Sequence, residues 1–244
     1  MEQVDAIAII LARAGSKGLP GKNRAIIAGK PCVSWTIEHV RTSTLLRRAG
    51  VSTDDEEIAI LAVEAGLEHW PRAAELASDT ARVDSAAREA LRQADRHRIV
   101  PPMAPVVLLY ANVPVRPPGL IDRAISLFIE SGCDSVQSYA AVGKHHPWWT
   151  ARLDEQGRVA PWQGTQLFGG VYRRQDLPPA FVPDGGVVVV KRSCLDAAEH
   201  DQANPHAFLG ADHRGVRTEA GEVVDIDGPT DLAVADQLLR RQSR

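Results

Sequence analysis

The chain has 244 residues, a length that fits one large domain or one core with an attached arm. Hydrophobic residues make up 44% and charged residues 24%, and the formal net charge is −3, which argues against nucleic acid or an anionic membrane as a partner. The cysteines Cys32, Cys133 and Cys194 are too far apart in sequence for a metal or redox pair. No stretch approaches the roughly 20 apolar residues of a membrane span, and no secretory leader opens the chain, so we expect a cytoplasmic protein.

Apolar runs of strand length alternate with segments of helical spacing along most of the chain. This alternation predicts an α/β fold, a mostly parallel sheet with flanking helices. In chain order we expect a strand over 7–11, a helix over 32–46, a short or distorted strand over 46–51, a helix over 55–65, an edge strand over 67–70, a charged surface helix over 83–97, a strand over 106–110, a helix over 120–130, strands over 134–139 and 186–190, a short helix from Ser193, a strand over 222–226 and a terminal helix over 229–241.

Residues 143–183 differ in character from the rest of the chain. They are rich in proline, glycine and aromatic residues, Trp148, Trp149 and Trp162 among them, and contain no long helical pattern. About 40 residues is long for a simple connection. We therefore expect a single domain, 1–244, with an inserted β-rich arm whose aromatics bury against a partner subunit or over the active site.

The loop that follows the first predicted strand has the composition of a phosphate-binding site. Residues 10–24 supply glycines at 15, 18 and 21 and cations at 13, 17, 22 and 24. Glycine lets backbone N–H groups approach an anion, and the cations complete the cradle. The spacing matches neither the Walker A pattern nor the dinucleotide fingerprint, and a solvated basic turn is the plainer alternative.

A second chemical feature closes the last predicted strand. Asp225 and Asp227 alternate with Ile226, so a strand would turn both carboxylates to one face. Two close carboxylates repel unless a cation lies between them, and Mg²⁺ prefers oxygen ligands together with phosphate. The alternative is that Asp227 only caps the helix that begins at Pro229.

Other candidates carry weaker signals. His145 and His146 lack a third metal ligand, which favours a structural role in the arm. Ser16 has no identifiable base beside it and, with Asn23, is better suited to hydrogen-bond phosphate or ribose. Arg116 follows a strand and has two interpretations: it holds an acidic group, or it makes a surface salt bridge.

These motifs resemble the acylneuraminate (CMP-sialic acid) cytidylyltransferases. The resemblance is carried by Leu-Ala-Arg-Ala-Gly-Ser-Lys-Gly-Leu-Pro-Gly-Lys-Asn over 11–23, by 51–58, 72–79, 112–116 and 174–178, and by Val-Asp-Ile-Asp-Gly-Pro-Thr-Asp over 224–231. It implies a Rossmann-like nucleotidyltransferase fold, a homodimer built with the arm, CTP as donor and Mg²⁺ as cofactor. By resemblance the CTP-binding residues are Arg13, Ala14, Gly15, Ser16, Lys17, Lys22, Asn23, Arg72 and Asp79, with Arg13, Lys17 and Lys22 catalytic and Asp225 and Asp227 on the metal.

The sequence departs from that family on the acceptor side. Tyr110 replaces a usual glutamine, and Asp-Gly-Gly-Val-Val over 184–188 replaces Asn-Gly-Ala-Ile-Tyr. Tyr110, Arg116 and Asp184 are the candidate acceptor-binding residues. The resemblance implies transfer of CMP to a sialic or related ulosonic acid with release of pyrophosphate. A small phosphonate is the alternative acceptor, and a non-catalytic nucleotide-binding protein is a further alternative.

Overall fold

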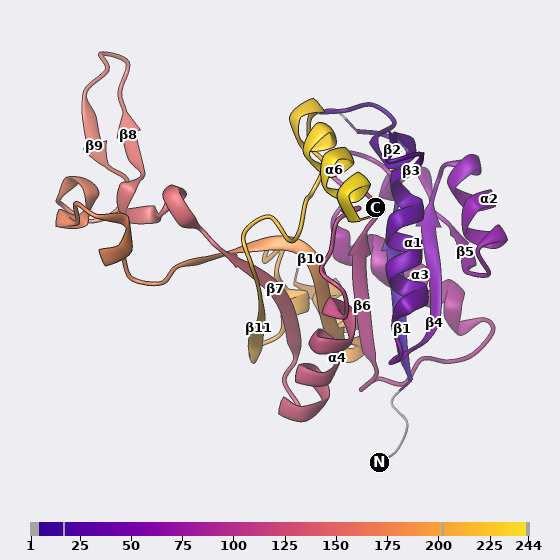
Figure 1. The fold of residues 1–244 in the computed structure, drawn as a ribbon. Helices are drawn as coiled ribbons and strands as arrows, with labels where there is room; N and C mark the ends of the chain where they lie inside the picture. The colour runs from indigo at the N-terminus through magenta and orange to yellow at the C-terminus, as the bar shows by residue number, and fades with distance from the viewer. Residues whose placement is uncertain (1–4, 17, 202, 243–244) are drawn as a thin grey trace.

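The computed structural model describes residues 5–16, 18–201 and 203–242, which form a central sheet, flanking helices and a long arm (Figure 1). Seven strands make the central sheet in the order β11-β7-β10-β6-β1-β4-β5. They are β1 (Ala6–Leu11), β4 (Leu46–Thr53), β5 (Glu68–Pro71), β6 (Pro105–Tyr110), β7 (Ser135–Ala141), β10 (Phe181–Lys191) and β11 (His213–Thr218). Two small sheets pair β2 (Ile26–Ile27) with β3 (Lys30–Pro31) and β8 (Ala151–Leu153) with β9 (Val159–Pro161).

The central sheet is mostly parallel, as the sequence predicts. Strand β1 pairs in parallel with β4 and β6, β4 with β5, and β7 with β11, whereas β10 runs antiparallel to both of its neighbours. The carboxyl ends of the six co-directional strands therefore lie at one edge. Open α/β sheets bind their ligands at such an edge.

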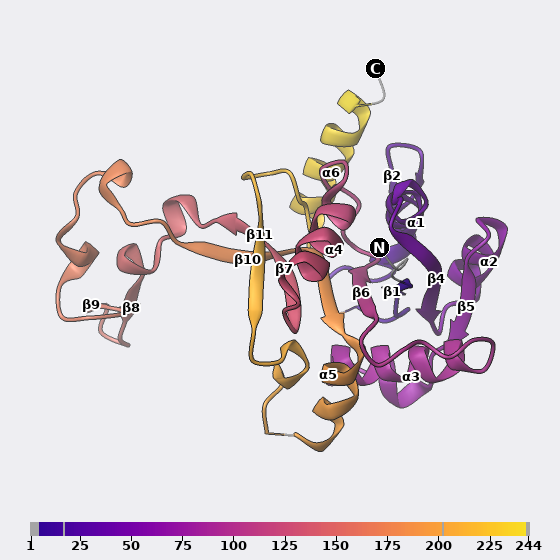
Figure 2. The same ribbon diagram turned by 90° about the horizontal axis from the view of Figure 1, so that it is seen from below.

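Helices cover both faces of the sheet (Figure 2). In the fully buried β1, Ala6, Ala8 and Ile10 face one core and Ile7 and Ile9 face the other. Helices α1 (Cys32–Thr42), α2 (Glu56–Glu64) and α4 (Leu120–Ser131) pack on the first face. Helices α3 (Val83–Asp95) and α5 (Arg192–Ala197) pack on the second. The terminal helix α6 (Pro229–Gln242) packs through Ala235 and Leu239 against Ile27 and Cys32.

Helix α3 is less of a surface helix than its charged sequence predicts. It buries an alanine-rich face, and it also buries the ion pair of Asp84 with Arg88, whose Nη1 lies 2.8 Å from the carboxylate. The small alanines let the helix lie close to the sheet.

Strand β4 is longer than the sequence predicts. The preceding helix stops at Thr42, and eight residues from Leu46 form the strand. Arg48 is accommodated because its guanidinium lies 2.9 Å from a carboxylate oxygen of Glu68 on β5. The expected distortion is present as a register shift opposite Ala6 and Ile7.

The prediction of a final strand over 222–226 is wrong. Val224 forms only an isolated bridge with Val115, and the last strand of the sheet is β11. The sequence His-Arg-Gly-Val-Arg-Thr of β11 gives little apolar signal, because it is an edge strand with several exposed residues. The Asp225 and Asp227 carboxylates are therefore positioned by a loop and not by strand alternation.

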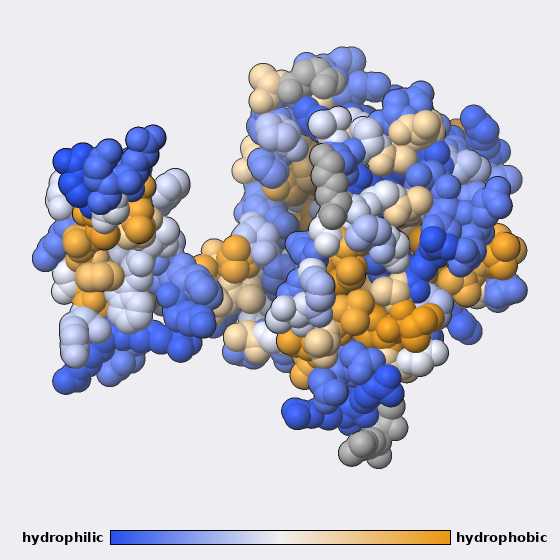
Figure 3. Space-filling view, turned by 90° about the horizontal axis from the view of Figure 1, so that it is seen from above, coloured by the Kyte–Doolittle hydropathy of each residue, from blue (hydrophilic) through white to orange (hydrophobic). Residues whose placement is uncertain are grey.

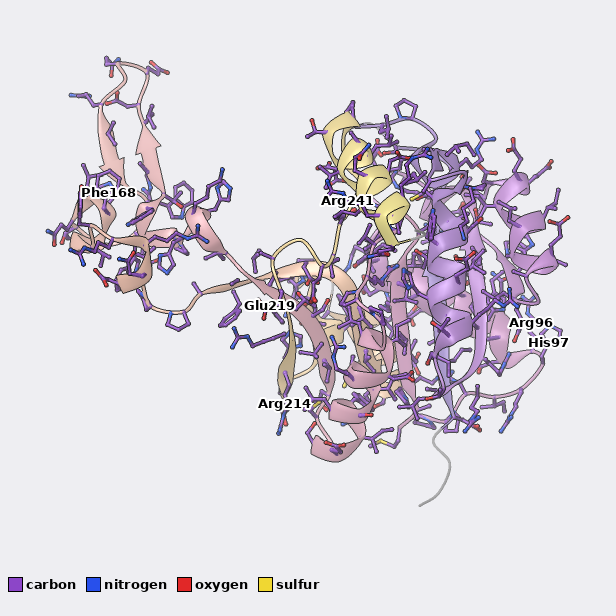
Figure 4. The ribbon with its side chains drawn as sticks, in the orientation of Figure 1. Arg96, His97, Phe168, Arg214, Glu219 and Arg241 are labelled. Carbon is purple, nitrogen blue, oxygen red and sulfur yellow. The ribbon has the colours of Figure 1, made fainter. Side chains whose placement is uncertain are left out.

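The chain between β7 and β10 forms an arm that projects away from the main body (Figures 1 and 3). The arm has a small packed centre, in which His146 is 4% exposed and its ring meets Trp148 edge-on at 5.6 Å. It exposes other aromatics, including Trp162, Phe168 and Tyr172. Phe168 lies at the far end of the arm (Figure 4). The arm extends to one side and does not fold back over the main body (Figures 1 and 2). No helix among the described residues combines the length and apolar character needed to cross a membrane.

Candidate active site

The glycine-rich loop lies at the carboxyl edge of the sheet, directly after β1. The Ala12 N–H donates to the Ser52 carbonyl at 3.0 Å, and the Ala14 N–H donates to Asp54 Oδ1 at 2.8 Å. The Asn23 side-chain amide donates to the Arg13 carbonyl at 2.8 Å, which closes the loop on itself. Gly21 has a φ of 68°, a left-handed conformation that favours glycine. These contacts fix the loop beside the ends of β1 and β4.

The same loop lies against the acidic segment near the C-terminus. A Cβ placed on Gly18 would lie 2.5 Å from the Asp227 carbonyl oxygen, so only glycine allows this approach. Lys22 Nζ lies 2.8 Å from Asp227 Oδ1. The fold therefore brings together the two motifs that the sequence separates by about 200 residues.

The acidic segment is fastened to the end of β6 by Asn112. The Ile226 N–H donates to the Asn112 carbonyl at 2.9 Å, and the Asn112 amide donates to the Ile226 carbonyl at 3.1 Å and to the Asp225 carboxylate. Asn112 was not among the predicted site residues. The sequence did hold a signal for its role, because Asn112 directly follows a strand at the edge of the sheet where α/β proteins bind their ligands.

Asp225 and Asp227 occupy different environments. Both residues are exposed, and the Asp227 side chain is 77% exposed, but only the Asp225 carboxylate accepts a hydrogen bond from the Asn112 amide. Partial desolvation of its carboxyl group, followed by the neighbouring Asp227 carboxylate, raises the pKa of Asp225 to about 6. No group of three or more metal-ligating side chains occurs among residues 5–16, 18–201 and 203–242. Two carboxylates beside a phosphate loop nevertheless suit Mg²⁺, which takes its other ligands from phosphate and water.

A cavity of about 150 Å³ opens between this loop and α3. Its walls combine cations with two buried polar atoms, Asn23 Oδ1 and Arg72 Nη2, that have no hydrogen-bond partner within the described structure. Burial lowers the pKa of Arg72 to about 10, although its Nε still donates to Ser52 Oγ at 3.2 Å. An unpaired buried donor and acceptor cost free energy, so their retention points to a ligand. The lining residues include Leu11, Arg13, Lys22, Asn23, Arg72, Ser78, Tyr110 and Asn112.

The other predicted nucleotide residues lie close by. Arg13 Nη1 is 2.6 Å from Asp79 Oδ1, and both side chains are about one third exposed. Gly15 is exposed, and Ala14 and Ser16 are half-buried. Lys17 lies outside the described residues.

The predicted acceptor residues separate into two groups. Tyr110 borders the cavity, and burial raises the pKa of its hydroxyl. Asp184 is already hydrogen-bonded to Ser138, Thr218 and the Gly186 N–H. Its carboxylate thus ties neighbouring strands together.

Arg116 is not at the surface, so the alternative of a surface salt bridge is wrong. The residue is 3% exposed, and its guanidinium donates to the Gly186 carbonyl at 2.6 Å, to Thr36 Oγ1 at 2.9 Å and to the Tyr110 carbonyl at 3.0 Å. With its donors engaged in this way, Arg116 joins the carboxyl end of β6 to the middle of β10. Its geometry lends no support to a direct contact with the acceptor.

Comparison with known proteins identifies the family. A family model described as cytidylyltransferase matches residues 7–146. The CMP-N,N'-diacetyllegionaminic acid synthase of Legionella pneumophila is 29% identical over 96% of this chain and 95% of its own length. The N-acylneuraminate cytidylyltransferase of Streptococcus agalactiae is 32% identical over 75% of this chain but only 42% of its own length.

Solved structures show the same fold. A CMP:2-keto-3-deoxy-manno-octonic acid synthetase complexed with CTP superposes with a TM-score of 0.70 at 16% identity, over 98% of this chain and 99% of the other. The 4-diphosphocytidyl-2C-methyl-D-erythritol synthase of Anaerococcus prevotii superposes with a TM-score of 0.66 at 13% identity, over 98% and 100%. With its family match over more than half its length, the chain belongs to the cytidylyltransferase family and is a nucleotidyltransferase.

Proposed function

We propose that the protein transfers CMP from CTP to a sialic acid-like ulosonic acid and releases pyrophosphate. The observation that carries this proposal is the cavity beside the glycine-rich loop, where Asn23 Oδ1 and Arg72 Nη2 are buried and unpaired. Cytosine offers one amino donor and two acceptors on its pairing edge. An unpaired acceptor and an unpaired donor can pair with that edge, and discrimination from uracil requires the acceptor to face position 4, where cytosine has an amino donor and uracil a carbonyl.

The loop supplies the positive charge that a triphosphate needs. Arg13 and Lys22 border the cavity, and Lys17 belongs to the same loop by sequence. Arg13 and Lys22 each have an acidic partner that a triphosphate would replace, Asp79 for Arg13 and Asp227 for Lys22. Such exposed pairs are weak and exchange partners at little cost.

Catalysis then consists of positioning and charge neutralisation. An acceptor oxygen attacks the α-phosphorus of CTP in line with the departing pyrophosphate. Lys22, Arg13 and Lys17 stabilise the charge that develops on the leaving group. Asp225 and Asp227 would hold Mg²⁺, which when bound neutralises phosphate charge. Desolvation and then the Asp227 carboxylate raise the pKa of Asp225, and a divalent cation between the two carboxylates would relieve the second of these effects.

A sugar acid is favoured over a phosphonate as the acceptor. A phosphonate carries up to two negative charges and needs free cations nearby. Arg116 is buried among carbonyl groups, and Arg82, which lines the cavity beside the glycine-rich loop, has its Nε 2.9 Å from Asp84 Oδ1. The names of the Legionella and Streptococcus relatives also point to nonulosonic acids.

The arm supports a homodimer. It extends away from its own main body and exposes aromatic side chains that a monomer would leave in water (Figure 3). A second copy of this chain is the partner that the family resemblance implies.

A pyrophosphate-release assay tests the proposed activity. We expect turnover with CTP, Mg²⁺ and N-acetylneuraminic acid or a related ulosonic acid, and at least about tenfold lower kcat/KM with UTP. A panel of phosphonates serves as the comparison. Turnover with phosphonates alone would contradict the acceptor assignment, and the absence of turnover with every acid would contradict the activity.

A further inference from the structure

A second, larger cavity of about 610 Å³ adjoins the nucleotide cavity on the sheet face covered by α3 and α5. The two cavities share Ala81, Arg82, Val83 and Tyr110, so a molecule in one lies beside a molecule in the other. The volume is typical of small-molecule sites. The apolar part of the lining includes Val83, Pro183, Val188, Pro205, Phe208 and Leu209.

One wall of this cavity is polar and comes from strands β7 and β11. Gln137 and Tyr139 are two residues apart on β7 and so share a face with Ser135. The neighbouring strand β11 places His213 opposite Ser135 and Gly215 opposite Gln137. A Cβ on Gly215 would lie 3.0 Å from Tyr139 Cδ2, so the missing side chain lets the tyrosine ring lie over β11.

The ring of Tyr139 thereby reaches His213. The two rings meet edge-on with centroids 6.0 Å apart, and the tyrosine oxygen lies 2.8 Å from His213 Nε2. His213 Nδ1 lies 2.7 Å from Ser135 Oγ, and Ser135 Oγ is hydrogen-bonded to the Leu209 carbonyl. Ser135 itself is fully buried.

The direction of each hydrogen bond in this series of contacts follows from its last acceptor, the Leu209 carbonyl. The Leu209 carbonyl can only accept, so the single Ser135 hydroxyl proton is donated to it. Ser135 must then accept from His213, which places the imidazole proton on Nδ1. Burial lowers the pKa of His213 and favours the neutral ring, whose Nε2 can only accept. The Tyr139 hydroxyl therefore donates to Nε2.

This order leaves the Tyr139 oxygen with accepting lone pairs and no free proton. The alternative bond from Tyr139 to Gln137 Oε1 is 3.5 Å long and weaker than the 2.8 Å bond to His213. Among the apolar residues around it, the tyrosine oxygen is thus held as an acceptor.

We propose that the hydrogen-bonded residues Ser135, His213 and Tyr139 determine acceptor specificity. In this proposal the Tyr139 oxygen accepts a hydrogen bond from an O–H or N–H group of the acceptor substrate. The inference rests on the proposed function and adds the substrate feature that this cavity selects. The selected feature is an apolar or acylated part of the sugar acid that carries one hydrogen-bond donor. Hydroxyl and secondary amide groups both supply such a donor, and the experiment distinguishes them.

The test compares Tyr139→Phe with the wild-type protein on a set of acceptors. N-acetylneuraminic acid is the starting probe, and in each analogue hydrogen replaces one hydroxyl or the acylamino group. We expect Tyr139→Phe to raise the acceptor KM about 3- to 10-fold and to leave the CTP KM within about twofold. For the one analogue that lacks the selected donor, the variant and the wild type should have equal KM. The identity of that analogue reveals whether the donor is a hydroxyl or an amide.

The Ser135–His213–Tyr139 hydrogen-bond series is tested by His213→Leu. The matched control is His97→Leu, which changes an exposed residue far from both cavities (Figure 4). His213→Leu should raise the acceptor KM as Tyr139→Phe does, and the double variant should be no worse than either single variant. His97→Leu should behave as wild type. Additive losses, or an unchanged KM in His213→Leu, would overturn the proposed chain.

Calorimetric binding of the same probe, in the presence of CMP, gives a second readout that needs no turnover. A wild-type protein that turns over while Tyr139→Phe has unchanged KM for every analogue overturns this inference alone. A wild-type protein that neither binds the probe nor releases pyrophosphate with any sugar acid overturns the proposed function as well.

Discussion

Gly18 and Asp227 lie in direct backbone contact, with room for only a hydrogen atom between the glycine Cα and the aspartate carbonyl oxygen. A Cβ at residue 18 would approach that oxygen to 2.5 Å, well inside van der Waals distance. This contact joins the phosphate loop to the carboxylate pair. The relative position of the two halves of the site thus depends on one glycine.

Gly18→Ala should therefore displace the loop from the acidic segment. We expect kcat/KM for CTP to fall at least about tenfold, because small displacements of positioned groups are costly in catalysis. The melting temperature should change little, because the loop is at the surface. Gly15→Ala is the matched comparison, since a Cβ there meets no atom within 4 Å. The fall in kcat/KM for CTP should be clearly smaller in Gly15→Ala than in Gly18→Ala. Equal losses in the two variants would refute the steric argument.

Asp227→Asn should separate catalysis from folding. The Asp227 side chain is largely exposed and its partner is Lys22, so the substitution should leave the thermal midpoint almost unchanged. Turnover at saturating Mg²⁺ should fall at least about 100-fold, because a neutral amide is a poor ligand for a hard divalent cation. Pyrophosphate release measures the loss, and Glu130→Gln, an exposed change on α4, is the control. Turnover near the wild-type level would remove Asp227 from the metal site.

Arg72→Met should weaken CTP binding without weakening the fold. In the free protein Arg72 is a half-buried cation with a buried, unpaired Nη2 and a pKa lowered to about 10, so its retention costs stability. An apolar side chain of similar length removes that cost. We expect an unchanged or higher melting temperature together with a 10- to 100-fold rise in the calorimetric Kd for CTP. A large fall in melting temperature would show that Arg72 is structural.

The sequence predicts the sheet, most helices and the phosphate loop because these depend on local patterns. Apolar runs mark β1 and β6, and glycines with lysines mark the loop. The polar edge strand β11 and the first half of β4 lack such a pattern, since their stability comes from neighbours such as Glu68 beside Arg48.

The position of Arg116 could not be predicted either. Its Val-Pro-Val-Arg segment predicts a cation that lies at the surface or binds a ligand. Its burial depends on carbonyl groups of β6 and β10 that only the folded chain assembles. The pairing of Tyr139 with His213 likewise joins residues 74 apart.

His39 should make the fold sensitive to mild acid. Burial, followed by the charge of Arg116, lowers the pKa of His39 to about 4, and its Nε2 is 3.1 Å from the Pro114 carbonyl. Because the unfolded chain binds this proton near pH 6.5, stability is complete above that pH and declines as the pH falls toward 4. The decline attributable to His39 is at most about 3 kcal/mol.

Denaturant unfolding at several pH values measures this contribution. His39→Gln keeps a donor for the Pro114 carbonyl and should reduce the loss of stability between pH 6.5 and 4. His97→Gln, on an exposed residue, should leave the wild-type pH profile unchanged. An identical profile in His39→Gln would show that other groups cause the acid sensitivity.

The arm should control self-association while contributing little to the stability of the main body. Trp162 and Phe168 are 56% and 55% exposed and lie on a segment that extends away from the sheet. Replacing both with serine should shift the protein from dimer to monomer in sedimentation velocity, because the variant loses apolar area that a partner would cover. Ile60→Ser, at a 57% exposed position on α2, is the matched control and should not change the sedimentation coefficient. A wild-type protein that sediments as a monomer, or a double variant that remains dimeric, would contradict the assignment of the arm to the subunit interface.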